Sequence, residues 1–88
     1  MKLIKSPNPS KKYRAMFDDG THTDFGASGY QDFTIHRDLM RQMNYLSRHR
    51  ATENWNDYKS AGALSRWILW NKPTIAESLR DYKKHFNL

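Results

Sequence analysis

The order of hydrophobic and polar residues predicts a β-hairpin near the start of the chain. Lys12–Phe17 and Thr21–Phe25 alternate in the manner of strands, and Asp18-Asp19-Gly20 lies between them. An Asp-Gly pair between two such segments is a strong hairpin signal. Leu3-Ile4 can add a third short strand. Two prolines follow it and each removes a backbone donor, so the sequence leaves both two strands and three strands as alternatives.

The first predicted helix spans about Asp38–His49 and has two contrasting faces. Leu39, Met43 and Leu46 recur at helical spacing and predict the face that packs into the core. The opposite face carries basic and amide residues at helical spacing: Arg37, Arg41, Asn44 and Arg48. We therefore expect one buried face and one basic face on this helix.

Ala61–Asn71 is predicted to be the central helix of the core. Most of this segment is apolar, and at 3.6 residues per turn its apolar residues do not keep to one stripe. A helix that is apolar nearly all round must be covered on several sides. The segment is too short to span a bilayer, which takes about 20 residues. Ser60 can cap its start, and Pro73 disfavours helix at the residue before it.

A last helix is expected from Thr74 onward, because Thr74 and Glu77 form a capping-box pattern. One apolar stripe follows at helical spacing: Ile75, Leu79, Tyr82 and Phe86. The expected fold is therefore α+β, with an N-terminal antiparallel β-hairpin, or three strands, packed on three α-helices in a single domain over residues 1–88. The expected core consists of Tyr13, Ala15, Phe17, Leu39, Met43, Leu46, Leu64, Trp67, Ile68, Ile75, Leu79, Tyr82 and Phe86.

The net charge of the chain limits the classes of partner that the protein is expected to bind. The chain has 15 Lys and Arg against 9 Asp and Glu, a net charge of +6, and a sequence pI near 9.8. Such an excess predicts attraction to polyanions, of which nucleic acid is one. There is no cysteine, which excludes disulfides, thiolate metal sites and a cysteine nucleophile. No signal peptide and no membrane span are expected, and residues 1–11 can serve as a basic arm.

The basic face of the first helix is the sharpest candidate site. Arginines on successive turns can follow a phosphate backbone, and each can bind a phosphate through two hydrogen bonds. The full candidate set for phosphate contact is Arg37, Arg41, Arg48, Arg50, Lys11, Lys12 and Arg14. The alternative is a solvated face, or one paired with Asp32, Asp38 and Glu53. No motif for reading bases is present, so contact would be independent of sequence.

Other chemistry is less well supported. The four histidines and nearby aspartates match no metal-ligand spacing, so we expect hydrogen-bonded histidines and no metal or cofactor. A structural polar cluster is expected to tie the loop after the first helix to the helices: Asp32, His36, His49 and Trp55. The serines lack a nucleophile motif, and a chain this small offers little core to hold a pocket. We therefore expect a protein that is not an enzyme.

Several segments carry a family resemblance. They are FGASGYQDFTIHRD at residues 25–38, YLSRHR at 45–50, ENWND at 53–57, AGALSRWILWNKPT at 61–74 and SLRDYKKHF at 78–86. Together they resemble an uncharacterised family of small basic proteins encoded by large DNA viruses of algae and protists, and by some phages. The resemblance covers about residues 12–87. It implies a viral origin and names no catalytic residue.

Two functions follow as expectations. The first is a small non-enzymatic viral protein that binds nucleic acid through phosphate contacts, in the virion or in the interior of an infected host cell. The alternative is a structural or interaction protein of the virus particle, with other virion proteins as partners. Neither expectation requires a cofactor.

Overall fold

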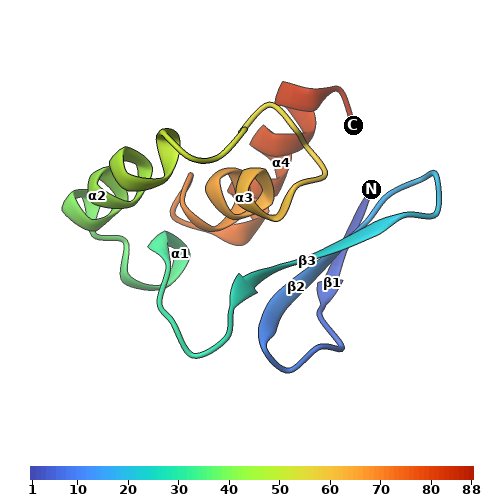
Figure 1. Ribbon diagram of the computed structural model, residues 1–88, viewed down its shortest axis with the longest axis horizontal. Helices are drawn as coiled ribbons and strands as arrows, with labels where there is room; N and C mark the ends of the chain where they lie inside the picture. Colours follow the sequence, from blue (N-terminus) through green and yellow to red (C-terminus); the bar gives the residue numbers. More distant parts are fainter.

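The N-terminal part of the chain forms a sheet and the rest is helical, as a computed structural model covering residues 1–88 shows (Figure 1). This confirms the α+β prediction. The elements in order are β1 (Lys2–Lys5), β2 (Lys11–Met16), β3 (His22–Ala27), α1 (Phe33–His36), α2 (Leu39–Arg50), α3 (Ala61–Leu64), the π-helix η1 (Ser65–Leu69) and α4 (Ile75–Phe86). No helix has the length and apolar character that crossing a membrane would take.

The sheet has the order β1-β2-β3 and is antiparallel throughout. The predicted hairpin joins β2 to β3, and its turn is closed by the Phe17 amide donating to the Thr21 carbonyl at 2.8 Å. Gly20 adopts φ +88° in this turn, a conformation that favours glycine. The third strand, which the sequence left open, is present as β1. The N-terminal segment is therefore part of the sheet rather than a free basic arm.

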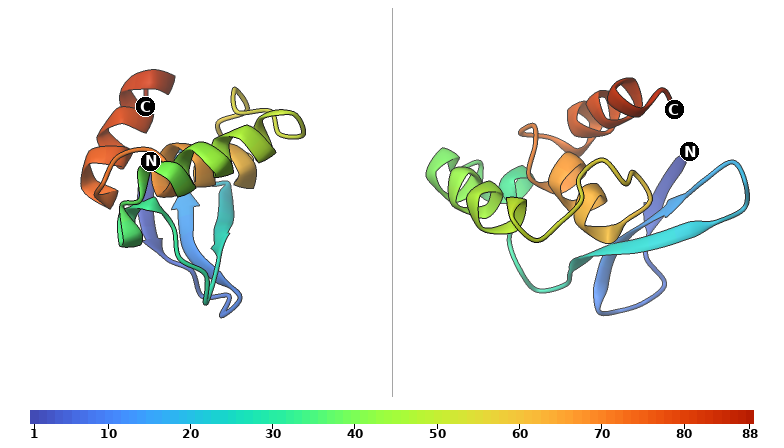
Figure 2. Two further views of the ribbon diagram at one scale, coloured as in Figure 1. Left: turned by 90° about the vertical axis from the view of Figure 1, so that its left-hand side faces the viewer. Right: turned by 45° about the horizontal axis from the view of Figure 1, so that its top comes forward.

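The segment α3–η1 is the centre of the core, as its composition predicts. It contacts β3 on one side and α4 on the other, and the views in Figure 2 show α4 and the sheet on opposite sides of it. The buried core cluster comprises Ala15, Phe17, Phe25, Leu64, Ile68, Leu69 and Tyr82. Of these, Phe25 and Leu69 were missing from the predicted core.

The central helix changes from α to π after Leu64. The Trp70 amide donates to the Ser65 carbonyl at 3.1 Å, five residues back, which adds one residue to the turn. Ile68 and Leu69 are consecutive, yet both are buried, at 0% and 2% exposure. Ala61, the first residue of the segment, is exposed.

Helix α2 packs through a different face from the one predicted. Leu39 and Met43 are 67% and 63% exposed, so their placement in the core was wrong. The half-buried residues of α2 are Gln42, Tyr45, Leu46 and His49, so Leu46 alone of the predicted stripe is partly covered. Gln42 Nε2 donates to the carbonyl oxygens of Trp70 and Asn71 at 3.1 and 2.7 Å, and Tyr45 stacks on Trp70. The end of η1 thus offers α2 backbone acceptors and a ring face, which amide and aromatic side chains satisfy better than aliphatic ones.

Helix α4 follows its prediction closely. The Thr74 hydroxyl accepts from the Glu77 amide at 3.2 Å, which caps the helix start. Tyr82 is fully buried, and its hydroxyl donates to the Tyr58 carbonyl at 2.6 Å. Burial raises the pKa of Tyr82 above its ordinary value. The rest of the predicted stripe is half-buried against the core: Ile75, Leu79 and Phe86.

Candidate nucleic-acid interface

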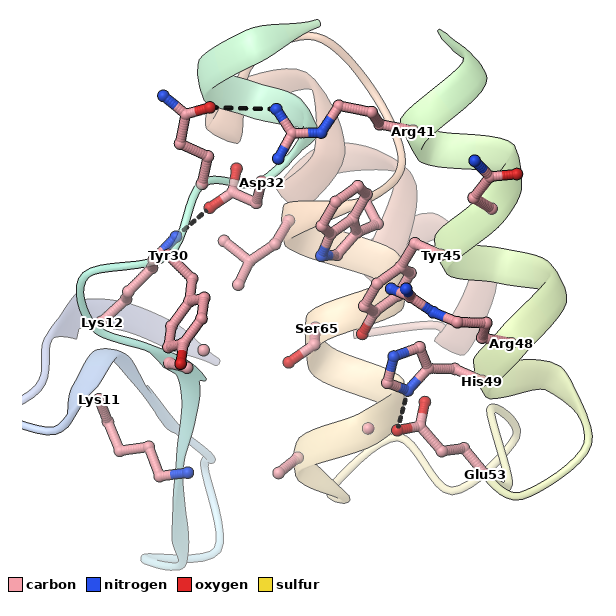
Figure 3. A pocket seen from close by; sticks show the side chains of 18 residues that line it. Lys11, Lys12, Tyr30, Asp32, Arg41, Tyr45, Arg48, His49, Glu53 and Ser65 are labelled. Atoms are coloured by element: carbon pink, nitrogen blue, oxygen red, sulfur yellow. Dashed lines mark hydrogen bonds and ion pairs between the residues drawn. The ribbon is translucent and has the colours of Figure 1, made fainter. Parts of the chain in front are cut away.

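A groove runs between the sheet and α2, with α3–η1 as its floor (Figure 3). Its volume is about 560 Å³, within the usual range of ligand clefts. One wall comes from the start of β2, the end of β3 and the loop 28–32, and the other from α2. Gly26, at φ +80°, lets β3 approach the floor, because a Cβ there would lie 2.8 Å from Leu69 Cδ1.

Basic side chains stand on both walls of the groove. Lys11 and Lys12 belong to β2, whereas Arg41 and Arg48 project from the opposite wall on α2 (Figure 3). Asn44 lies between the two arginines at helical spacing. The sequence predicted the α2 cations and the lysines separately. The fold brings them to one concavity.

The first carboxylate of the groove, that of Asp32, is already satisfied. It is 3% exposed and accepts from Lys12 Nζ at 2.6 Å and from the Thr34 amide at 2.9 Å. A buried carboxylate needs such partners, because leaving it unpaired would be strongly destabilising. Lys12 is thus occupied in holding the loop to β2, and its charge is matched within the protein.

The second carboxylate, that of Glu53, is also satisfied by neutral or histidine donors. Trp55 Nε1 donates to Glu53 Oε1 at 3.0 Å, and His49 Nδ1 lies 3.0 Å from Glu53 Oε2. The carboxylate lies against the backbone of Gly62, where a Cβ would come within 2.9 Å of Glu53 Cδ. Glycine at this position therefore keeps Glu53 close to the start of α3.

The α2 arginines consequently have no carboxylate partner. Arg41 Nη1 donates to the amide oxygen of Gln31 at 3.1 Å, and Arg48 has no side-chain hydrogen bond or ion pair. Lys11 makes no ion pair either. Asp38, a suggested partner, instead caps α2 by accepting from the amides of Met40 and Arg41. The structure therefore does not have the alternative arrangement, in which the basic face of α2 pairs with Asp32, Asp38 and Glu53.

Three other candidates lie outside the groove. Arg14 forms a two-bond ion pair with Asp24 at 2.8 and 3.1 Å, and this hydrogen bonding lowers the pKa of Asp24. Arg37 is not part of the α2 stripe, which corrects the prediction. It ends α1 in the left-handed region at φ 54°, and its Nε donates to the Pro73 carbonyl at 3.1 Å. Arg50 is the exposed last residue of α2.

A row of stacked rings supports the α2 wall. Tyr45 lies between Trp70, at 4.2 Å and nearly parallel, and His49, at 4.1 Å. Burial, with the nearby Glu53 charge, raises the pKa of Tyr45 to about 12. Sequence reasoning missed Tyr45 and Trp70 as site residues. The available signal was the spacing of Gln42, Tyr45 and His49, a polar and aromatic stripe on the same helix.

The predicted polar cluster does not form as one unit. Only His49 and Trp55 are joined, through Glu53. Asp32 binds Lys12, and His36 Nδ1 accepts from the Asp38 amide at 2.9 Å, so these two residues lie in separate networks. No group of three or more His, Cys, Asp or Glu residues is placed to hold a metal ion.

Comparison with known proteins gives one match. The model of a family described as "Family of unknown function (DUF5754)" matches residues 1–49, more than half of the chain. That part contains the sheet, α1 and nearly all of α2, and so both walls of the groove. No curated protein and no solved structure matches the chain.

Proposed function

We propose that this chain, which belongs to the DUF5754 family of unknown function, is a non-enzymatic protein that binds nucleic acid through phosphate contacts in the groove. The observation that carries the proposal is the state of the α2 arginines. Arg41 and Arg48 line a concave surface, and both carboxylates of that surface are engaged by other groups. Their charge is therefore available to an external anion.

The arrangement suits a phosphate chain. Arg41 and Arg48 are seven residues apart on α2, so they are about 10 Å apart along the helix axis. Guanidinium groups bind phosphate oxygens through paired hydrogen bonds. Lys11 contributes a third cation from the opposite wall. Binding through phosphates would be independent of base sequence.

Viral nucleic acid is the partner that we propose in the cell. This part of the proposal rests on the resemblance to proteins of large DNA viruses and phages. We accordingly propose that the chain acts in the virion or inside the infected host cell.

Fluorescence anisotropy with labelled random oligonucleotides tests the proposal. With three phosphate contacts, log Kd is expected to change with log salt concentration with a slope of magnitude roughly 2 to 3. Arg41→Glu with Arg48→Glu should reduce that slope by about 1 for each residue and weaken binding at low salt. Arg80→Glu is the matched single-charge control, because Arg80 is exposed on α4 and does not line the groove.

The outcomes separate the proposal from general charge attraction. A loss confined to the groove variants supports it. Equal losses per charge in the groove variants and in Arg80→Glu would mean that only net charge matters. Absence of binding at low salt would end the proposal.

A second candidate, a structural or interaction protein of a virus particle, is favoured by the outer face of α1 and α2. Four large apolar side chains there are more than half exposed: Ile35, Leu39, Met40 and Met43. Contiguous exposed apolar side chains are typical of protein interaction sites. Incorporation into purified particles stripped of genome tests this candidate. Leu39→Asp with Met43→Asp should abolish incorporation, whereas the groove variants should keep it.

A further inference from the structure

The aromatic residues that line the groove differ in whether their ring faces are free. Tyr45 is covered on both faces by Trp70 and His49. Trp70 contacts Tyr45 and also His36, whose ring centroid is 5.3 Å away. Tyr30 is 74% exposed and has no aromatic neighbour. Tyr30 is therefore the aromatic residue of the groove whose ring is most available to a stacked ligand, because Tyr45, His49 and Trp70 are each half-buried and stacked on another ring.

The backbone around Tyr30 is held in place. Its amide donates to the Ala27 carbonyl at 3.4 Å, and Gly29 turns the chain just before it at φ +84°. Two residues later the buried Asp32 side chain is fixed by Lys12. Figure 3 shows Tyr30 on the wall that carries Lys11 and Lys12, facing Arg41 and Arg48 across the groove.

We infer that the groove takes single-stranded nucleic acid, with one unpaired base stacked on the ring of Tyr30. Lys11 holds a neighbouring phosphate on the same wall, and Arg41 and Arg48 hold phosphates on the opposite wall. This inference rests on the proposed function and adds the type of strand. In a duplex, base faces are stacked on one another and only their edges reach the grooves, so a tyrosine at the rim would find no base face.

The arrangement of the groove walls, like the exposed ring of Tyr30, favours a single strand over a duplex. Its cations stand on two facing walls of a cavity of about 560 Å³. A cavity of that size can take one unpaired base between walls that hold the flanking phosphates, but it is too small for a double helix. Grooves that combine cations with aromatic platforms are the usual device for binding single strands without sequence preference.

The test compares Tyr30→Ala with Tyr30→Phe on a single strand and on the duplex of the same sequence. Tyr30→Ala should weaken single-strand binding at least about fivefold, the lower end of the effect of one stacked base. Tyr30→Phe keeps the ring and should bind like the parent. Duplex binding should be weaker than single-strand binding and unchanged by either variant. Because Tyr30 is exposed, neither variant should alter the fold, which circular dichroism checks.

A direct readout uses a single strand that carries 5-iodouracil. Irradiation should cross-link the modified base to Tyr30, and peptide mass spectrometry identifies the residue. Cross-linking to Tyr30 in the parent supports the inference. Cross-links that avoid Tyr30, together with unchanged affinity in Tyr30→Ala, would overturn it.

Failure of the inference is distinguishable from failure of the proposed function. If duplex binds as tightly as single strand and Arg41→Glu with Arg48→Glu weakens both, the strand assignment is wrong and phosphate binding in the groove stands. If neither nucleic acid binds at low salt, both are wrong.

Discussion

Helices α2 and α4 have the same length of 12 residues, a side-chain cap at the start and basic residues in the last turn. Each also carries an apolar stripe that predicts a buried face. In α4 the stripe is packed, and Tyr82 has no exposed surface. In α2 the residues Leu39 and Met43 are mostly exposed, and the helix contains no fully buried residue. An apolar stripe therefore identifies a helix face that favours burial, but it does not identify which surface, if any, of the same chain covers that face.

The largest expected effect tests the buried side of this comparison. Tyr82→Ala should lower the free energy of unfolding by roughly 3–5 kcal/mol, because it removes a fully buried ring and its hydrogen bond to Tyr58. Denaturant unfolding measures the change. A loss below about 1 kcal/mol would contradict the placement of α4 on the core.

The next effect tests what holds α2. Gln42→Ala should cost about 1–2 kcal/mol, because two backbone carbonyls lose their side-chain donor. Asn44→Ala, also on α2 but with no side-chain hydrogen bond, is the control and should change stability little. Equal effects of the two substitutions would show that the amide face does not attach the helix.

A pH titration of Tyr45 tests the packing of the same face of α2. The Tyr45 phenol has its pKa raised to about 12 by burial and by Glu53, from an ordinary value of 10.0. The folded state therefore holds its proton longer than the unfolded state, so the contribution of Tyr45 to stability is present below pH 10 and is lost between pH 10 and about 12. The ionisation that Tyr45→Phe removes from the phenolate absorbance titration should lie near pH 12. Loss of an ionisation near pH 10 instead would place Tyr45 outside the stack.

The smallest effect concerns the outer face of α2. Leu39→Ser with Met43→Ser should change the free energy of unfolding by no more than about 1 kcal/mol in the isolated protein, because both side chains are already largely in water. Thermal unfolding measures it. A loss comparable to that of Tyr82→Ala would show that another surface covers this face in solution.

Much of the fold could be predicted because its signals are local. The Asp18-Asp19-Gly20 turn predicts the hairpin, and the Thr74 cap with its stripe predicts α4. The register of that hairpin sets Arg14 opposite Asp24. Their ion pair was therefore within reach of the sequence, since strands that meet at a known turn have known partners.

The packing of α2 and the shape of the site could not be predicted in this way. Gln42 donates to carbonyls that are free because the central helix ends beside them, far along the chain. The carboxylate of Asp32 is taken by Lys12 rather than by an arginine, which depends on how the loop folds back on β2. The helical periodicity of the sequence identified Arg41 and Arg48, but it could not show that β2 and the loop 28–32 form the opposite wall of the groove.

The π turn at η1 has a consequence for chains of slightly different length. Each residue of an α-helix turns the chain by about 100° about the axis, so an α-helix with the same number of residues would turn Trp70 away from Tyr45. Deleting one residue within Ser65–Leu69 would instead allow an ordinary α-helix in which Trp70 donates to the same Ser65 carbonyl, now four residues back, and stays against Tyr45. Related sequences one residue shorter in this segment should therefore keep the surface on which α2 rests, whereas related sequences of the same length need the π turn.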